Sequence, residues 1–289
     1  MVSLMVQMHA LDEQQAKVAH APDGPLLVLA GAGTGKTNAL MGRVGRLIED
    51  GVEPSRIMVV TFTQKSAHSM IERLQVFLPD CAADLCAGTF HGIGLRFLRT
   101  YAERLNFGPS FRVLSAYQST ELLTEVMASL PESLLSRLPD ARNVRRIQSL
   151  QVNSNRSLGN IIASGRWQLR VEEEELETVF LAYVLRKLEL NVMDYDDLLA
   201  NWLVLMTEYE DVLVEVRTAF DHVLVDEYQD INPLQASLLE LVSAEHGCLT
   251  VVGDSRQAIY GFRGADVSQI TSFSSRTDVQ TISLDQNYR

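Results

Sequence analysis

A glycine-rich segment between a short apolar run and a helical pattern constrains the fold of this chain more than any other feature. Residues 26–37 read LLVLAGAGTGKT, which predicts a buried strand, a tight turn and the start of a helix. Gly31, Gly33 and Gly35 allow backbone N–H groups to curl around phosphate oxygens, and the helix N-terminus that follows favours an anion. Lys36 is expected to reach the β- and γ-phosphates of a nucleotide, and the Thr37 hydroxyl is expected to hold Mg²⁺. The segment therefore predicts a phosphate-binding loop.

This prediction has one alternative. The usual pattern begins with Gly, and this chain has Ala30 at that position, so the segment can also be a glycine-rich loop with a chance Lys-Thr pair. The strand–turn–helix context favours nucleotide binding.

The surrounding sequence alternates between short apolar runs and helical patterns. Each apolar run is too short for a helix and ends in turn or polar residues, which is typical of a buried strand. Strands that alternate with helices predict an α/β fold, with a parallel sheet flanked by helices. The expected strands are Leu26–Ala30, Ile57–Thr61, Leu85–Thr89, Val223–Asp226, Leu249–Gly253 and Thr281–Leu284.

An acidic pair follows the fourth of these runs, in VLVDEYQD at residues 223–230. Asp226 at the strand end is expected to hold Mg²⁺, and Glu227 to orient or deprotonate an attacking water. Alone, the pair can be a solvated loop with common acids, but beside a phosphate loop it is typical of a nucleotide hydrolase. Lys36 and Asp226 are 190 residues apart, which indicates an insertion within the nucleotide-binding domain.

The middle of the chain predicts helices. Between about residues 107 and 190 there is no convincing buried strand, and the acidic run Glu172–Glu175 is expected near the start of the last helix, where the dipole favours anions. We therefore expect an α/β domain interrupted by an all-helical insertion. The predicted division is 1–106 for the first part of the α/β domain, 107–190 for the insertion and 191–289 for the second part.

Composition excludes several classes of protein. The chain has 289 residues, 46% of them hydrophobic, which is enough to bury a core. Three Cys cannot form a disulfide framework, no apolar run approaches the roughly 18 residues of a membrane helix, and the N-terminus lacks a basic signal region. These observations predict a soluble, cytoplasmic protein with no membrane partner. The net charge of −12 argues against a broad basic DNA-coating surface, but a local groove of aromatic and Arg side chains stays compatible with it.

Further motifs occur in a fixed order. They are LDEQQ at 11–15, AGAGTGKT at 30–37, VVTFTQKSAHSMIERL at 59–74, AGTFHGIGLRFL at 87–98, VDEYQD at 225–230, VVGDSRQAIYGFRGAD at 251–266 and LDQNYR at 284–289. In this order they resemble the N-terminal half of superfamily 1 DNA helicases of the UvrD/Rep/PcrA type, across essentially the whole chain. That family's phosphate loop tolerates Ala at its first position, which removes the objection of Ala30.

The resemblance implies a P-loop NTPase (RecA-like) sheet with an inserted domain of the 1B type, ATP and Mg²⁺ as ligands, and a role for each matching position. Gln15 would read the adenine, Gln257 would sense the γ-phosphate, and Arg289 would touch the γ-phosphate. The ATP-binding set implied by the resemblance is Gln15, Ala32, Gly33, Thr34, Gly35, Lys36 and Thr37, with Lys36, Glu227, Gln257 and Arg289 catalytic. The residues implied to face single-stranded DNA are Phe62, Thr89, His91, Tyr260, Phe262 and Arg263.

Some of these residues have plainer interpretations. Phe62 can be a core side chain, and His91 can cap or orient a loop. The stretch from Arg137 to Arg156 holds five Arg and one acid, and it is either a duplex-phosphate contact or an ordinary solvated face. The histidines at 9, 20, 68, 222 and 246 have no metal-ligand spacing, and Cys81 with Cys86 forms a C-x₄-C pair without further ligands.

The function implied by the resemblance is an ATP-dependent DNA helicase or translocase, moving 3′ to 5′, in replication, repair or recombination. Its partners would be single-stranded DNA and duplex junctions. Such motors use a second RecA-like domain, whose motifs are missing from this sequence, so weak turnover is expected of this chain alone. The alternatives are a nucleotide-dependent DNA-binding module or adaptor without unwinding activity, and the helicase part of a recombination nuclease complex.

Overall fold

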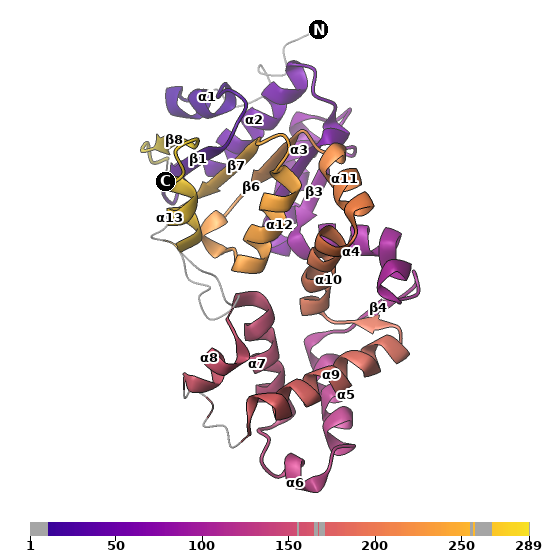
Figure 1. Cartoon of the computed structure of the whole chain (residues 1–289). Coiled ribbons are helices and arrows are strands. Elements are labelled where there is room, and N and C mark those ends of the chain that lie inside the picture. Colours follow the sequence, from indigo (N-terminus) through magenta and orange to yellow (C-terminus); the bar gives the residue numbers. More distant parts are fainter. Residues whose placement is uncertain are drawn as a thin grey trace. The chain divides into compact units, whose positions relative to one another are not determined.

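Six parallel strands form the central sheet of the protein, as the sequence predicts. The computed structural model describes residues 11–154, 156–164, 167, 171–254, 257 and 268–288 (Figure 1). They divide into two compact units, one comprising residues up to 93 and from 206 onward, the other comprising residues 94–205. The sheet belongs to the first unit, and the predicted boundaries at 106/107 and 190/191 stay a prediction.

The sheet has the strand order β3-β2-β6-β7-β1-β8, with every adjacent pair parallel. All carboxyl ends of the strands therefore lie along one edge, where open α/β sheets bind ligands. Each strand lies within one residue of its predicted bounds. The strands are β1 Leu26–Ala30, β2 Ile57–Thr61, β3 Cys86–Thr89, β6 His222–Val225, β7 Leu249–Gly253 and β8 Gln280–Leu284.

Helices cover the sheet because alternate strand residues are apolar on both faces. On one face, Leu26 and Val28 of β1 and Val59 of β2 join a core with apolar residues of α1, α2 and α3. Leu27 and Val225 point to the other face, are fully buried, and α12 contacts β6. The helices that lie wholly in this unit are α1 Glu13–Ala19, α2 Lys36–Glu49, α3 Gln64–Phe77, α11 Glu210–Ala219, α12 Pro233–Ser243 and α13 Ser268–Ser274.

The second unit is built almost entirely from helices. Its core joins residues of α5, α7, α8 and α9, including Leu123, Ile147 and Tyr183, all fully buried. The acidic run begins α9 as expected, with Glu172 as its N-cap in a capping box with Glu175. The helices are α5 Ala116–Ala128, α6 Glu132–Leu135, α7 Ala141–Ser154, α8 Leu158–Ala163 and α9 Glu173–Glu189. Two more helices, α4 Phe90–Tyr101 and α10 Tyr195–Glu208, have residues in both units.

One short strand pair in this unit was not expected. In it, β4 Arg112–Val113 lies parallel to β5 Val192–Met193. Two residues are too few for an alternating pattern, so the sequence carried no periodic signal for β4. The pair joins the entry of the insertion to its exit.

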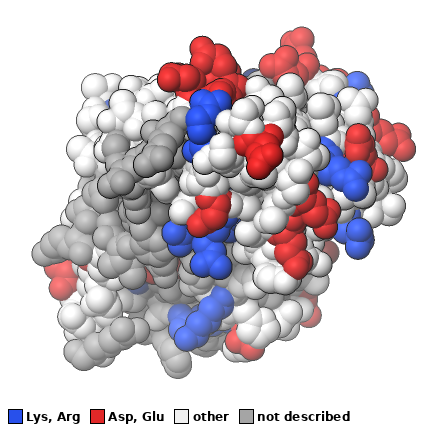
Figure 2. Space-filling view, turned by 90° about the horizontal axis from the view of Figure 1, so that it is seen from below, with Lys and Arg blue, Asp and Glu red and all other residues white. Residues whose placement is uncertain are grey.

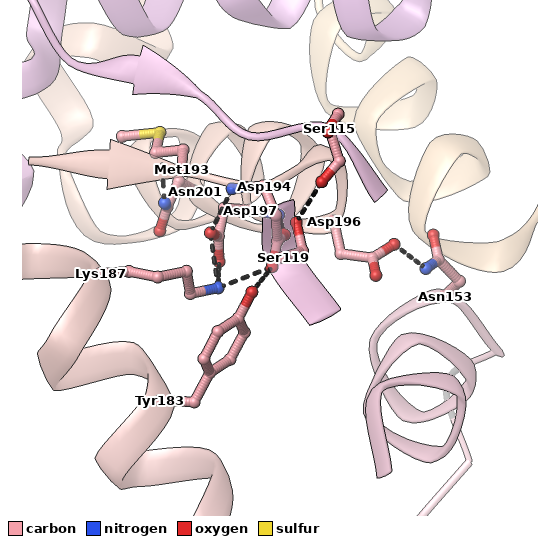
Figure 3. A network of polar contacts seen from close by, with 10 residues as sticks. All are labelled: Ser115, Ser119, Asn153, Tyr183, Lys187, Met193, Asp194, Asp196, Asp197 and Asn201. Atoms are coloured by element: carbon pink, nitrogen blue, oxygen red, sulfur yellow. Dashed lines mark hydrogen bonds and ion pairs between the residues drawn. The ribbon is translucent and has the colours of Figure 1, made fainter. Parts of the chain in front are cut away.

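A buried ion-pair network lies beside this strand pair (Figure 3). The Lys187 ammonium donates to Asp194 Oδ2 at 3.0 Å and to Asp197 Oδ2 at 2.6 Å, and the Tyr183 hydroxyl also donates to Asp194, at 3.1 Å. Burial and the nearby Asp194 carboxylate raise the pKa of Asp197 to about 7, against the opposing effect of Lys187. The network fixes α9 against the start of α10.

No helix among the described residues is both long and apolar enough to cross a membrane.

Candidate nucleotide site and strand-end loops

The predicted phosphate loop connects β1 to α2 at the carboxyl edge of the sheet. Gly33 and Gly35 have φ values of +81° and +78°, a conformation that glycine adopts without strain. The Thr34 side chain closes the turn, since its hydroxyl donates to the Gly31 carbonyl at 2.9 Å. Lys36 and Thr37 then form the first turn of α2, whose free N–H groups and dipole favour a phosphate.

Lys36 is paired with the predicted catalytic carboxylate. Its Nζ lies 2.9 Å from Glu227 Oε2, with the Lys36 side chain 11% exposed and that of Glu227 32% exposed. Glu227 follows β6 and has φ +55°, which is unusual for a residue with a side chain. This backbone turn directs the carboxylate toward the phosphate loop, so the structure brings together two residues 191 positions apart.

Asp226 directly follows β6 and is buried, with 7% of its surface exposed. Its Oδ1 accepts a hydrogen bond from the Glu227 backbone N–H at 2.9 Å. Burial, with a contribution from the Glu227 carboxylate, raises the pKa of Asp226 to about 6, against the opposing charge of Lys36. Burial makes the charged form of this carboxylate unfavourable, and a bound cation would offset that cost, so Asp226 fits the role of a Mg²⁺ ligand.

Gln229 was not assigned a role by the sequence analysis, although it lies within the quoted VDEYQD motif. Its side chain is buried and donates to Glu227 Oε2 at 2.7 Å, while its Oε1 accepts from the Asp254 backbone N–H at 3.0 Å. Asp254 in turn accepts from Gln257 Nε2 at 2.7 Å. A chain of hydrogen bonds thus links Glu227 to Gln257, the predicted γ-phosphate sensor, and only these two end residues had a predicted role.

Gln15 lies directly against the phosphate loop. It is buried in α1, and its Nε2 donates to the Thr34 carbonyl at 3.2 Å. A Cβ at Gly35 would displace that same Nε2, and the positive φ of Gly35 favours glycine by itself. The side chain predicted to read the adenine therefore also supports the loop.

The segment after β8 also binds the phosphate loop, a contact that the motif pattern did not predict. Asn287 Nδ2 donates to the Ala32 carbonyl at 3.2 Å, and the Tyr288 backbone N–H donates to the Gly33 carbonyl at 3.0 Å. The Tyr288 hydroxyl donates to Asp12, the N-cap of α1, and the Tyr288 side chain is about half exposed. An aromatic ring consequently lies beside the loop, near Gln15.

The predicted DNA-facing residues of the first half follow β2 and β3 at the same sheet edge. Phe62 comes directly after β2 and is partly buried. Thr89 ends β3, and its hydroxyl accepts the Gly92 backbone N–H at 3.1 Å, which caps the start of α4. Burial lowers the pKa of His91, in the first turn of α4, to about 4, so this imidazole is neutral at pH 7.

Four predicted site residues lie outside the described residues: Tyr260, Phe262, Arg263 and Arg289. Their roles stay predictions. The residues that the structure does describe at the nucleotide site come from the segments after β1, β6, β7 and β8 and from α1 and α2.

Comparison with known proteins identifies the family. Residues 11–278 match the UvrD/REP helicase N-terminal domain. The chain belongs to the UvrD/REP helicase family. The resemblance inferred from the ordered motifs is thereby confirmed, and so is the prediction of a P-loop NTPase sheet flanked by helices.

Individual relatives of this UvrD/REP chain are DNA helicases by name. It is 31% identical over 299 residues to the ATP-dependent DNA helicase PcrA of Leuconostoc citreum, covering 100% of this chain and 38% of that protein. It is also 31% identical over 284 residues to PcrA of Staphylococcus aureus strain Mu50, and 30% identical over 290 residues to PcrA of Staphylococcus epidermidis. The chain spans 38% of the length of each of these relatives.

Proposed function

We propose that this chain is the ATP-binding motor domain of an ATP-dependent DNA helicase that translocates on single-stranded DNA. The observation that carries the proposal is the meeting of Lys36, Asp226 and Glu227 at one sheet edge, in a chain of the UvrD/REP family. A phosphate loop beside a strand-end Asp-Glu pair suits hydrolysis of a nucleotide.

Each residue of the site has a definite task in this proposal. Lys36 leaves Glu227 and binds the β- and γ-phosphates, while Thr37 and Asp226 hold Mg²⁺. When bound, Mg²⁺ neutralises negative charge on the phosphates. Released from Lys36, Glu227 orients the attacking water and accepts its proton. The N–H groups of the loop at Ala32–Gly35 hold the phosphate oxygens.

The base-binding side is formed by α1 and the segment after β8. The Gln15 side chain donates to the phosphate loop at Thr34, and the half-exposed Tyr288 is bound to the loop at Gly33 and to Asp12 at the start of α1. We propose that Gln15 recognises the adenine edge and that Tyr288 stacks on the base. Any base can stack on an aromatic side chain, and such stacking is worth about 1–3 kcal/mol per base.

The DNA side is proposed to lie over β2 and β3. Phe62, Thr89 and His91 follow these neighbouring strands, on the side of the sheet away from β1. Tyr260, Phe262 and Arg263 are proposed to complete the strand path. A neutral imidazole at residue 91 suits stacking or hydrogen bonding to DNA better than an ion pair with phosphate.

Charge on the insertion supports only a local contact with duplex DNA. On the face shown in Figure 2, the described Lys and Arg side chains are interspersed with Asp and Glu. Arg137 is paired with Glu175, whereas Arg142 and Arg146 are exposed one helical turn apart on α7. We propose that these last two contact duplex phosphates, and that residues 107–190 act as the 1B-type insertion. The 3′ to 5′ direction is proposed from the family resemblance.

ATP hydrolysis measured with and without single-stranded DNA tests the proposal. We expect MgATP binding that Lys36→Ala reduces at least tenfold, and hydrolysis that single-stranded DNA stimulates in the protein carrying this domain. Unchanged ATP binding by Lys36→Ala would overturn the assignment of the site. Binding of ATP and DNA without strand separation would favour the alternative, a nucleotide-dependent DNA-binding module.

A further inference from the structure

Three potential metal ligands meet at the sheet edge opposite the nucleotide site. Asp23 precedes β1, His222 begins β6 and Cys248 precedes β7, and these three strands are neighbours in the order β6-β7-β1. One ligand atom from each side chain lies within 4.8 Å of the other two. The residues are far apart in sequence, so no ligand spacing revealed them.

The distances are close to those of a metal site. Bond lengths of 2.0–2.3 Å to Zn²⁺ place tetrahedral ligand atoms about 3.3–3.7 Å apart. His222 Nε2 and Asp23 Oδ1 are already 3.8 Å apart, and the Asp23 side chain is 74% exposed. A rotation of this exposed carboxylate brings Asp23 closer to the other two ligands, while His222 and Cys248 are buried.

The donor types select a particular class of cation. A thiol, an imidazole and a carboxylate are a zinc-type set, whereas Mg²⁺ and Ca²⁺ prefer oxygen ligands only. An imidazole binds a metal in its neutral form and a cysteine binds it as the thiolate, so binding of a cation releases the Cys248 thiol proton.

The immediate surroundings contain both favourable and opposing groups. The Cys248 backbone N–H donates to His246 Nδ1 at 2.9 Å, which fixes the cysteine. The Arg43 guanidinium lies nearby and opposes a cation, but its Nη atoms are held by the carbonyls of Ala21 at 2.8 Å and Pro22 at 3.3 Å. A thiolate and the Asp23 carboxylate together supply two negative charges, which offset a divalent cation.

We propose that Asp23, His222 and Cys248 bind one zinc-type divalent cation, with water as the remaining ligand. The cation ties together the amino ends of β1, β6 and β7. Because it binds the folded chain, it raises the thermal stability of the protein, independently of ATP.

Co²⁺ is the probe for this site, because a bound thiolate gives cobalt a strong near-ultraviolet charge-transfer band. The whole chain is freed of metal with a chelator and titrated with Co²⁺ without nucleotide. We expect a band that saturates at one Co²⁺ per chain, disappears on addition of Zn²⁺ and is absent in Cys248→Ser. Zn²⁺ is expected to raise the Tm by several degrees. Absence of the band, or its survival in Cys248→Ser, would overturn the proposal.

Matched variants separate this site from other causes. Cys81→Ser with Cys86→Ser removes the two other thiols and should leave the band intact. Asp23→Asn changes only an exposed ligand, so the chain should fold normally and bind Co²⁺ at least tenfold more weakly. Unchanged affinity in Asp23→Asn would also refute the three-ligand site. The nucleotide site contains no sulfur among its predicted ligands, so the band is independent of the proposed helicase function.

Discussion

The ion pair between Lys36 and Glu227 should compete with nucleotide binding. Lys36 cannot hold Glu227 at 2.9 Å and bind phosphate oxygens fully at the same time. We therefore expect Glu227→Gln to bind ATP and ADP more tightly than the unmodified chain, although it loses the general base. Glutamine matches glutamate in shape, so the backbone strain at φ +55° is unchanged.

The size of the effect follows from the exposure of the pair. Glu227 is 32% exposed, and partly exposed ion pairs are worth up to about 1 kcal/mol. Loss of this competition should therefore strengthen nucleotide binding by about fivefold. In the same variant, hydrolysis by a turnover-competent protein should fall by about 10²–10⁴-fold.

Calorimetric titration with ATP, ADP and AMP measures this prediction. AMP lacks the phosphates that Lys36 would bind, so its affinity should stay unchanged. Glu132→Gln on the exposed helix α6 makes the same change in net charge and should leave all three affinities unchanged. Equal or weaker ATP binding by Glu227→Gln would refute the competition between the carboxylate and the phosphates.

Four further predictions concern stability and catalysis. Gly35→Ala should weaken ATP binding and lower the free energy of unfolding by about 1–2 kcal/mol, because Gly35 has a φ of +78° and an added Cβ would displace Gln15 Nε2. The control Gly51→Ala, at a φ of +98° with no atom within 4 Å of the added Cβ, should lower the free energy of unfolding without changing ATP binding. Lys187→Met removes the ion-pair partner of the buried Asp194 and the partly buried Asp197 and should lower the free energy of unfolding by about 3–5 kcal/mol, whereas Lys17→Met removes an exposed pair and should leave the Tm nearly unchanged in thermal melts. Burial raises the pKa of Asp226 to about 6, so the free energy of unfolding falls as the pH rises from about 4 through 6, where the unfolded chain has already lost this proton. Asp226→Asn should therefore raise the free energy of unfolding at pH 7 by up to about 3 kcal/mol and weaken Mg²⁺-dependent ATP binding. An unchanged denaturant midpoint would contradict this prediction. Gln229→Leu breaks the link between Glu227 and Asp254 and should reduce kcat at least tenfold with a smaller effect on KM, as steady-state kinetics would show.

The sequence predicted the strands closely because the central ones are buried on both faces. Runs such as LLVLA and IMVVT are almost entirely apolar, and each is followed by turn or polar residues, so their ends lie within a residue of the observed ones. The two-residue strand β4 has no such pattern and was missed. The motifs likewise identified Lys36 and Glu227 but not their direct pairing, because a motif records residue order and not contacts across the sheet.

The residues that escaped prediction act through tertiary contacts. Gln229 and Tyr288 stand inside the motifs VDEYQD and LDQNYR, yet their partners are Asp254 after β7, Asp12 at the N-cap of α1 and the phosphate loop. His222 and Cys248 had no ligand spacing because two neighbouring strands, rather than one turn, bring them together. Only the strand order of the folded sheet reveals these contacts.

The strand order also has a consequence for the synthesis of this chain on the ribosome. β6 and β7 separate β1 from the β2–β3 pair, and both are made after the whole insertion. At about 5–20 residues per second, the three earliest strands wait roughly 10–30 s for the strands that join them. During that interval their apolar residues have no complete sheet to enter, while the insertion already contains the residues of its own core. The nascent chain is thus expected to depend most on chaperones before β7 emerges, and to acquire its nucleotide site only at the end of synthesis of this domain.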